Sequence, residues 1–217
     1  IESYDISNWG DGTSVAGMVV FEDGKPKKAG YRRFKMNTVA GTDDYASMAE
    51  TLARRAAEYE KGAKGQFGIK PDLLLIDGGR GQVSAVQAAL AGTQLADVPM
   101  FGMVKDDKHR TRGLVSAAGG EIMLAMHRGV FTFVTSIQDE THRWANDYRR
   151  RMQKSRAYSS TLQSVPGVGP ATSRALMAHF KTVSAVKEAS EEQLAGAKGV
   201  SRAAARAVYA HFHPQPE

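Results

Sequence analysis

Three side chains in the first two thirds of the sequence could together bind a divalent cation. Asp5 lies inside the strand pattern 4–6, where a carboxylate is costly to bury and needs a partner such as a metal ion. Asp77 directly follows the apolar run 73–76, which places it at the C-terminal end of a buried strand, where α/β sheets bind ligands. His142 is the third candidate, either as a ligand or as a general base.

The absence of cysteine restricts the chemistry of such a site. The chain of 217 residues has no Cys, so it has no disulfide, no zinc–thiolate site and no thiol nucleophile. Any metal must be held by carboxylate, imidazole or water, which favours hard cations. A structural alternative exists for each residue: either Asp could be a solvated strand end or a helix cap, and a single helical His often serves packing alone.

The hydrophobic pattern predicts an α/β fold that brings these residues together. Strands are expected at 1–7, 14–22, 30–36, 73–76 and 99–104, with the second and third forming an antiparallel hairpin. Helices are expected from about Thr42 to Gly62, over 82–90, and over 135–156 with His142 on its polar face. This order puts the first and fourth strands within pairing reach, so that Asp5 and Asp77 would face one crevice.

The positive charge is concentrated at the C-terminal end. The chain has a net charge of +6, yet residues 1–142 carry 17 basic and 18 acidic side chains, while 143–217 carry 12 basic and 5 acidic ones. A basic module beside a near-neutral one is typical of a polyanion-binding element appended to a separate domain, although a solvated basic surface is the alternative. The polar stretch 154–160 is interpreted as a linker, which gives domains at 1–153 and 161–217.

The second domain contains an internal repeat. Six residue types between Leu162 and Phe180 recur 32 positions later, between Leu194 and Phe212. Each repeat predicts a helix, a short turn at 166–169 or 198–201, and a second helix. Such a turn directs backbone N–H groups and a helix N-terminus at a phosphate oxygen without reading a base, unless it is only an interhelical turn. The predicted DNA contacts in and after these turns are Gly167, Val168, Gly169, Arg174, Gly199, Val200, Ser201 and Arg202.

Two other features concern cellular context. No run of about 18 apolar residues is present, so a membrane span is not expected and a cytoplasmic setting is the default. The chain begins with a strand-like segment at Ile1, without an initiator Met or a basic signal region, which suggests a fragment of a longer protein. The glycines at 78–81 lack the Lys-Ser/Thr ending of a nucleotide-binding loop and are interpreted as allowing close backbone approach beside Asp77.

Five strings of the sequence form a recognisable set, at 4–8, 31–34, 43–48, 74–82 and 138–145, and the Pro-Gly-Val-Gly repeat follows them. The most specific parts of this set are Ile-Asp-Gly-Gly-x-Gly-Gln and Asp-Glu-x-His. Together these strings resemble the C-terminal half of the UvrC family, the nuclease subunit of the bacterial UvrABC excinuclease. The resemblance covers essentially the whole chain.

The resemblance implies an RNase H-like endonuclease domain, a mixed sheet with flanking helices, followed by a small all-α tandem helix-hairpin-helix domain. Asp5, Asp77 and His142 match the family's catalytic triad, which would use Mg²⁺ or Mn²⁺, and Asp44 matches a further Asp associated with activity. The position of Asp44 at a helix start favours an N-cap role. Lys105, at a strand end, is a candidate phosphate contact.

By resemblance, the chain would incise DNA 5′ to a lesion in nucleotide excision repair, acting on double-stranded or bubble DNA. UvrB would be its partner subunit, with UvrA upstream in the pathway. Two departures are noted: Asn8 replaces a common His, and Ser201 replaces the glycine of the first turn. The family's GIY-YIG nuclease domain and its UvrB-contacting segment are missing from this sequence.

Two other function classes are compatible with parts of the pattern. A DNA-binding scaffold with a decayed site would keep the basic repeat, but the paired carboxylates Asp5 and Asp77 are present. A nuclease acting on RNA–DNA hybrids would share the first domain. The tandem hairpins favour duplex DNA, because they contact phosphates without sensing the 2′-hydroxyl.

Overall fold

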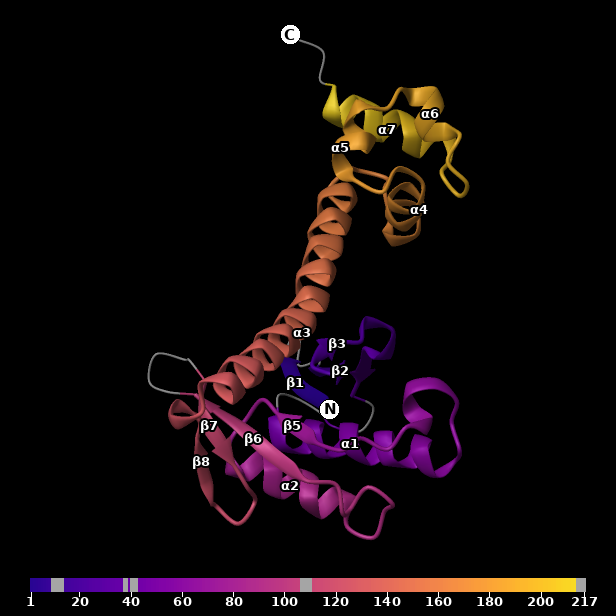
Figure 1. The fold of residues 1–217 in the computed structure, drawn as a ribbon. Coiled ribbons are helices and arrows are strands. Elements are labelled where there is room, and N and C mark those ends of the chain that lie inside the picture. The colour runs from indigo at the N-terminus through magenta and orange to yellow at the C-terminus, as the bar shows by residue number, and fades with distance from the viewer. Residues whose placement is uncertain (9–13, 37–38, 40–42, 106–110, 214–217) are drawn as a thin grey trace. The chain divides into compact units, whose positions relative to one another are not determined.

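The computed structural model describes residues 1–8, 14–36, 39, 43–105 and 111–213, with the backbone alone for 148, 149 and 151–160. The chain divides into two compact units, Ile1–Arg149 and Arg150–Glu217 (Figure 1).

Eight strands of the described residues form a mixed sheet at the centre of the first unit. Its order is β3-β2-β1-β5-β6-β7-β8, with β4 also paired to β2. Strands β1, β5 and β6 are parallel, and the remaining pairs are antiparallel. The predicted pairing of the first and fourth expected strands is confirmed, because β1 lies beside β5. The strands are β1 Glu2–Asn8, β2 Ser14–Glu22, β3 Lys25–Pro26, β4 Arg32–Lys35, β5 Leu74–Ile76, β6 Met100–Lys105, β7 Thr111–Val115 and β8 Glu121–Met123.

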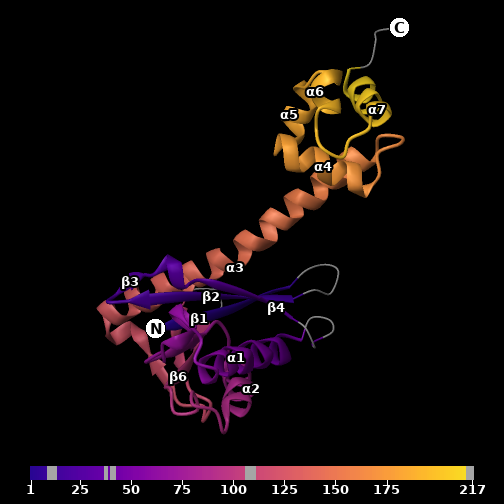
Figure 2. The same ribbon diagram turned by 90° about the vertical axis from the view of Figure 1, so that its right-hand side faces the viewer.

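Helices cover both faces of this sheet. Helices α1 (Asp44–Glu60) and α2 (Arg80–Leu90) lie on one face, and α3 (Arg128–Gln163) begins on the other, as Figure 2 shows. Because successive strand residues point to opposite faces, each face has its own core. Tyr4 and Ile76 pack with α1 and α2, whereas Leu75 packs with Ile137 of α3. Asp5 and Asp77, one residue after Tyr4 and Ile76, are therefore on the α3 side.

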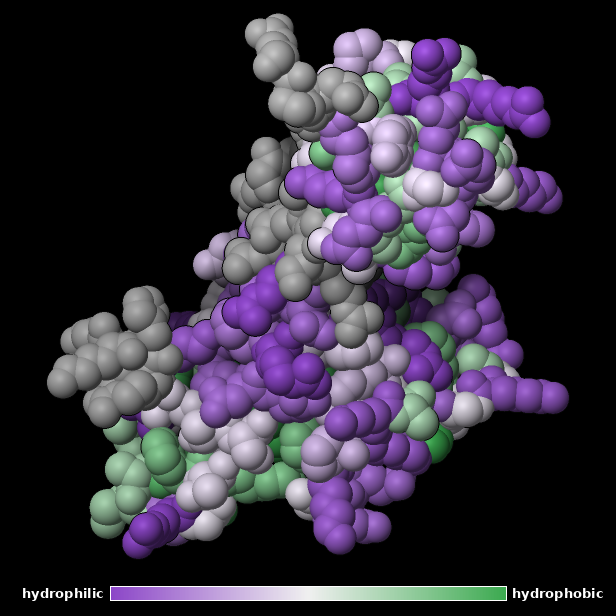
Figure 3. Space-filling model, turned by 90° about the horizontal axis from the view of Figure 1, so that it is seen from above, coloured by the Kyte–Doolittle hydropathy of each residue, from purple (hydrophilic) through white to green (hydrophobic). Residues whose placement is uncertain are grey.

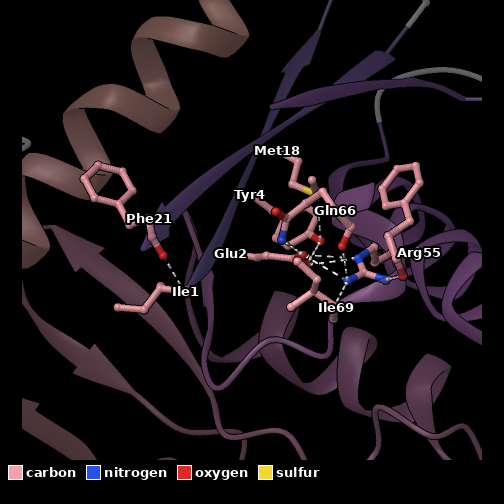
Figure 4. Close-up of polar contacts among 9 residues, drawn as sticks. Ile1, Glu2, Tyr4, Met18, Phe21, Arg55, Gln66 and Ile69 are labelled. Atoms are coloured by element: carbon pink, nitrogen blue, oxygen red, sulfur yellow. Dashed lines mark hydrogen bonds and ion pairs between the residues drawn. The ribbon is translucent and has the colours of Figure 1, made fainter. Parts of the chain in front are cut away.

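A buried polar network fixes the start of β1 (Figure 4). The guanidinium of Arg55, from α1, has no exposed surface and donates to Glu2 at 3.0–3.3 Å. It also donates to the carbonyls of Gln66, Phe67 and Ile69, in and just after the 3₁₀ turn Gly65–Gly68. One buried cation thus ties α1, this turn and the strand that carries Asp5.

Helix α3 is longer than its apolar stripe predicts. It begins at Arg128, seven residues before the expected start at 135, and continues to Gln163. Residues 154–160, predicted to be a linker, therefore lie within a helix. They include neither Gly nor Pro, so the local sequence has no residue type that would interrupt helical hydrogen bonding. The division into domains at 1–153 and 161–217 stays a prediction.

The second unit is a small helical domain around one apolar cluster. Its core residues include Leu162, Val168, Leu176, Leu194 and Val208. The end of α3 with α4 and α6 with α7 form the two predicted helix–turn–helix repeats, and α5 connects them. The helices are α4 Pro170–Phe180, α5 Val183–Glu188, α6 Glu191–Ala195 and α7 Arg202–Phe212.

Hydrophilic residues dominate the face of the molecule drawn in Figure 3, and hydrophobic residues are exposed there in separate areas. Among the described residues, none of the helices combines a membrane-spanning length with the necessary apolar character.

Candidate functional site

Asp5, Asp77 and His142 converge at one point of the first unit. Each offers a ligand atom, and these atoms lie within 4.8 Å of one another. His142 Nδ1 is 3.1 Å from Asp5 Oδ2 and 3.8 Å from Asp77 Oδ2. The three residues are separated by up to 137 positions in sequence, so the fold brings them together.

The parallel pairing of β1 with β5 places the two carboxylates side by side. Tyr4 is in register with Ile76, and the Asp77 amide donates to the Tyr4 carbonyl at 2.8 Å. The next residue on β1 is Asp5, and both carboxylates point toward the face that α3 covers. His142 reaches them from α3. Two buried residues of α3 set its position: Ile137 packs in the cluster that contains Leu75, and the Thr141 hydroxyl donates to Ser3 Oγ of β1 at 2.9 Å.

The site concentrates negative charge in a desolvated place. The Asp5 and Asp77 side chains are only 11% and 4% exposed. Burial raises the pKa of Asp5, and the charge of Asp77 adds to this effect, while the hydrogen bond with His142 opposes it. That same hydrogen bond holds the pKa of His142 above its usual value, with burial acting against it. Both groups therefore keep a proton to a higher pH than free side chains would.

These residues fit a divalent cation. Two nearly buried carboxylates close to each other repel unless positive charge lies between or beside them. In the structure His142 and Lys105 supply it, since Lys105 Nζ is 3.1 Å from Asp77 Oδ2. Two carboxylate oxygens and one imidazole nitrogen, completed by water, form a donor set suited to Mg²⁺ or Mn²⁺. His142, with its side chain 59% exposed, keeps one edge of the site open to solvent.

A hollow of about 530 Å³ lies beside the triad. Its walls come from the end of β6, the start of β7 and the first half of α3. This places open space next to the polar groups of the site, where part of a substrate could enter. The lining residues are Lys105, Thr111, Phe131, Thr135, Gln138, Asp139 and His142.

Asp44 lies outside this group of three. It is the first residue of α1, and its Oδ1 accepts a hydrogen bond from Asn8 Nδ2 at 2.6 Å. The predicted N-cap role is wrong, because Asp43 is the cap and its side chain accepts from the Ala46 amide. The observed cap lies one residue before the predicted one, since either of the two adjacent aspartates could have served as the cap. A catalytic role for Asp44 stays a prediction.

Lys105 contacts Asp77 in this structure, although it was predicted to contact phosphate. Lys105 could make these two contacts one after the other, because it ends β6 beside the hollow. Its side chain is one third exposed and could turn from the carboxylate to a bound phosphate once another cation neutralises Asp77. The phosphate contact stays a prediction.

The two helix-hairpin-helix turns are alike in backbone but differ in capping. Gly167 and Gly199 have φ values of +84° and +89°, which favour glycine. Gly169 begins α4 without a side-chain cap, whereas the Ser201 hydroxyl accepts from the Ala204 amide at the start of α7. Pro170, the first residue of α4, has no N–H, so each helix start leaves two amides for an external acceptor, those of Ala171 and Thr172 in α4 and those of Arg202 and Ala203 in α7.

The predicted contacts in these turns divide into two groups. Val168 is buried in the helical core and Val200 packs against it, and the amide of each donates within its turn. Val168 and Val200 therefore shape the turns, and neither their side chains nor their amides are available to a ligand. The exposed members of the predicted set are Gly167, Gly169, Arg174, Gly199, Ser201 and Arg202.

Two residues of the site were not predicted from the sequence. Gln138 donates to Asp77 Oδ1 at 2.7 Å, and Thr111 donates to Gln138 Oε1. The signal for Gln138 was its position four residues before His142, which puts both on one face of a helix. Thr111 gave no signal, because its strand was not expected.

Comparison with known families places both units. Residues 1–145 match the model of the UvrC RNase H endonuclease domain, and residues 159–213 match that of a SAM-like helix-hairpin-helix tandem. Proteins named UvrABC system protein C are similar along nearly the whole chain. That of Acetivibrio thermocellus is 44% identical over 229 residues, covering 99% of this chain and 36% of the relative. That of Lachnospira eligens is 43% identical over 220 residues, covering 98% and 35%.

The chain thus spans about a third of the length of these relatives. The family model covers more than half of the chain, and the matched residues include Asp5, Asp77 and His142. This chain belongs to the UvrC family, of which it contains the RNase H endonuclease domain and the helix-hairpin-helix tandem.

Proposed function

We propose that this chain hydrolyses phosphodiester bonds in DNA at a divalent-cation site formed by Asp5, Asp77 and His142. The observation that carries the proposal is the convergence of these three side chains beside an open hollow, within a domain that matches an endonuclease family. Mg²⁺ or Mn²⁺ is the proposed cation. When bound, it supplies Lewis acidity toward the phosphate and lowers the pKa of a coordinated water.

The protein's own groups have separable tasks. Asp5 and Asp77 hold the cation with carboxylate oxygens. His142 has two roles compatible with its geometry. While Nδ1 donates to Asp5, Nε2 is the nitrogen that can take a proton from the attacking water; alternatively, Nδ1 loses its proton and becomes a ligand. Lys105 would neutralise charge on the phosphate.

The helical unit would provide DNA affinity without sequence preference. Its exposed glycine turns and the exposed side chains of Arg174 and Arg202 are suited to phosphates, whose contacts position a protein on DNA. We assign duplex or bubble DNA as the ligand of this unit.

The finer biological role rests on the family resemblance and on the names of the relatives. We assign the chain to the incision 5′ to a lesion in nucleotide excision repair, in the cytoplasm, with UvrB as the partner subunit of the family and UvrA upstream. The relatives' name, UvrABC system protein C, supports the link to UvrA and UvrB, whereas the 5′ side and the cytoplasm follow from the resemblance alone.

Nicking of a lesion-bearing duplex tests the proposal. With UvrA, UvrB and Mg²⁺ or Mn²⁺ present, the chain should nick the damaged strand, and Asp77→Ala should abolish nicking while DNA affinity stays within about threefold. Asp72→Ala is the matched control, because Asp72 is exposed just before the same strand. Nicking by Asp77→Ala at the parent rate would remove Asp77 from the mechanism. Cleavage of RNA–DNA hybrids alone would replace the proposed substrate.

A further inference from the structure

We propose that Gln138 is a positioning residue that orients the Asp77 carboxylate for the cation. The inference rests on the proposed function, since it concerns the same site. Gln138 lies on α3, is 4% exposed, and places its side-chain amide between Asp77 and the strands β6 and β7.

The hydrogen-bond pattern fixes which way the amide points. Gln138 Nε2 lies 2.7 Å from Asp77 Oδ1 and 3.4 Å from the Met103 carbonyl oxygen. An ionised carboxylate and a carbonyl are acceptors only, so the NH₂ group must face them. Gln138 Oε1 therefore faces Thr111, whose hydroxyl must donate. A flipped amide would set its oxygen against Asp77 Oδ1 and the Met103 carbonyl, so these two acceptors fix the orientation, and the Thr111 hydroxyl anchors the other end of the amide by donating to Oε1.

The two carboxylate oxygens of Asp77 therefore have different partners. Oδ1 is held by Gln138, whereas Oδ2 faces Lys105 Nζ at 3.1 Å and His142 Nδ1 at 3.8 Å. Asp77 therefore presents one oxygen, Oδ2, to the centre of the triad. Because an amide donor is neutral, Gln138 stabilises the carboxylate without adding a charge that competes with a cation. Lys105, bound to Oδ2, does compete.

The alternative hypothesis is that Gln138 is only a hydrogen-bonded buried amide that supports the core. The two hypotheses predict different effects when the Gln138 amide is removed. A core role costs folding stability alone, whereas a positioning role also weakens cation binding, because groups that orient metal ligands typically contribute about 10- to 100-fold in affinity. Cation affinity of the folded protein is therefore the decisive measurement.

The chain provides a matched control in Gln66. This glutamine is also buried, and its Nε2 donates to a buried carboxylate, Glu2 Oε1, at 3.2 Å. Glu2 is not one of the three candidate ligands. Gln66→Met and Gln138→Met thus remove the same kind of hydrogen bond and keep a side chain of similar length.

The experiment is a Mn²⁺ titration of the full 217-residue chain and its variants, followed by the electron paramagnetic resonance signal of free Mn²⁺, with a thermal melt of each protein. Gln138→Met should bind Mn²⁺ about 10- to 100-fold more weakly, whereas Gln66→Met should bind like the parent. Asp77→Asn is the reference for loss of a ligand. If the parent itself does not bind Mn²⁺, the proposed function fails; if Gln138→Met binds within twofold of a binding parent, this inference fails.

Thr111 provides a second variant that keeps the test decisive if Gln138→Met does not fold. Thr111→Val removes the hydroxyl that anchors Gln138 Oε1, so the amide is held less firmly and Mn²⁺ affinity should fall in the same direction, and Thr111→Ser should restore it. Thr51→Val, which removes a buried hydroxyl from α1, is its control and should leave the affinity unchanged. Parent-like affinity in Thr111→Val would contradict the role assigned to Thr111. Losses that add in full in the double variant would contradict a shared path, because residues acting through one contact are not additive.

Discussion

The buried pair of Arg55 and Glu2 should be among the largest single contributors to the stability of the first unit. Replacing Arg55 with Met keeps the length and apolar part of the side chain but leaves the Glu2 carboxylate, 1% exposed, without its cation. Breaking a buried ion pair from one side costs about 3–5 kcal/mol.

Two features of the structure adjust this figure in opposite directions. Arg55 also donates to the carbonyls of Phe67 and Ile69, at 2.9 and 2.6 Å, and both would lose that donor. Against this, Tyr4 and Gln66 still donate to Glu2, at 2.8 and 3.2 Å, and so limit the penalty. We expect a loss of about 4 kcal/mol in the free energy of unfolding, or a Tm lower by about 8–16 °C.

Urea unfolding at pH 7, followed by a signal from the first unit, measures this loss. Lys61→Met is the control, because Lys61 and its partner Glu58 are 71% and 44% exposed and such a pair should contribute less than about 1 kcal/mol. Adding Glu2→Gln to Arg55→Met should recover part of the stability, since the uncompensated charge is then gone. Equal losses for Lys61→Met and Arg55→Met would refute the reasoning.

Three further outcomes are expected. Mn²⁺ affinity should rise with pH through a range above about 6.5, because Asp5 holds the pKa of His142 above its usual value and the cation must displace the His142 proton. Mn²⁺ titrations at several pH values check this, and His142→Ala should flatten the pH dependence. Lys105→Met should strengthen Mn²⁺ binding, by removing a competing charge 3.1 Å from Asp77, yet slow DNA cleavage; a faster rate would contradict the assigned phosphate contact. Deleting residues 160–217 should weaken DNA binding and flatten its dependence on salt, and an unchanged slope in a binding assay would leave the basic region as a solvated surface.

The positions of the paired carboxylates could be predicted from the sequence because strand ends leave a strong local signal. The apolar run before Asp77 and the alternation around Asp5 fixed the strands, and the order of elements fixed their pairing, as the register of β1 and β5 confirms. The strands β7 and β8 were missed. Their segments 111–115 and 121–123 are short, and Gly113 weakens the strand pattern of the first. Glycine fits at this position because an added Cβ would approach the Ile122 carbonyl oxygen to 2.6 Å.

Contacts between side chains from distant elements could not be predicted. The hydrogen bond from Gln138 to Asp77 depends on how α3 crosses the sheet, and Thr111 depends on a strand that was not expected. The choice between Asp43 and Asp44 as the helix cap depends on the entry angle of the chain, which neither side chain encodes alone. Such details follow from packing, which is settled by the whole domain.

Anomalous X-ray diffraction from crystals of this chain soaked in Mn²⁺ tests the central claim most directly. We expect an anomalous peak bounded by Asp5 and Asp77, with carboxylate oxygens at about 2.0–2.3 Å, and no such peak in Asp77→Asn. His142 should lie either in the coordination sphere or one water away from the ion. A protein that cleaves DNA with Mn²⁺ while its anomalous peak lies away from Asp5 and Asp77 would contradict the account.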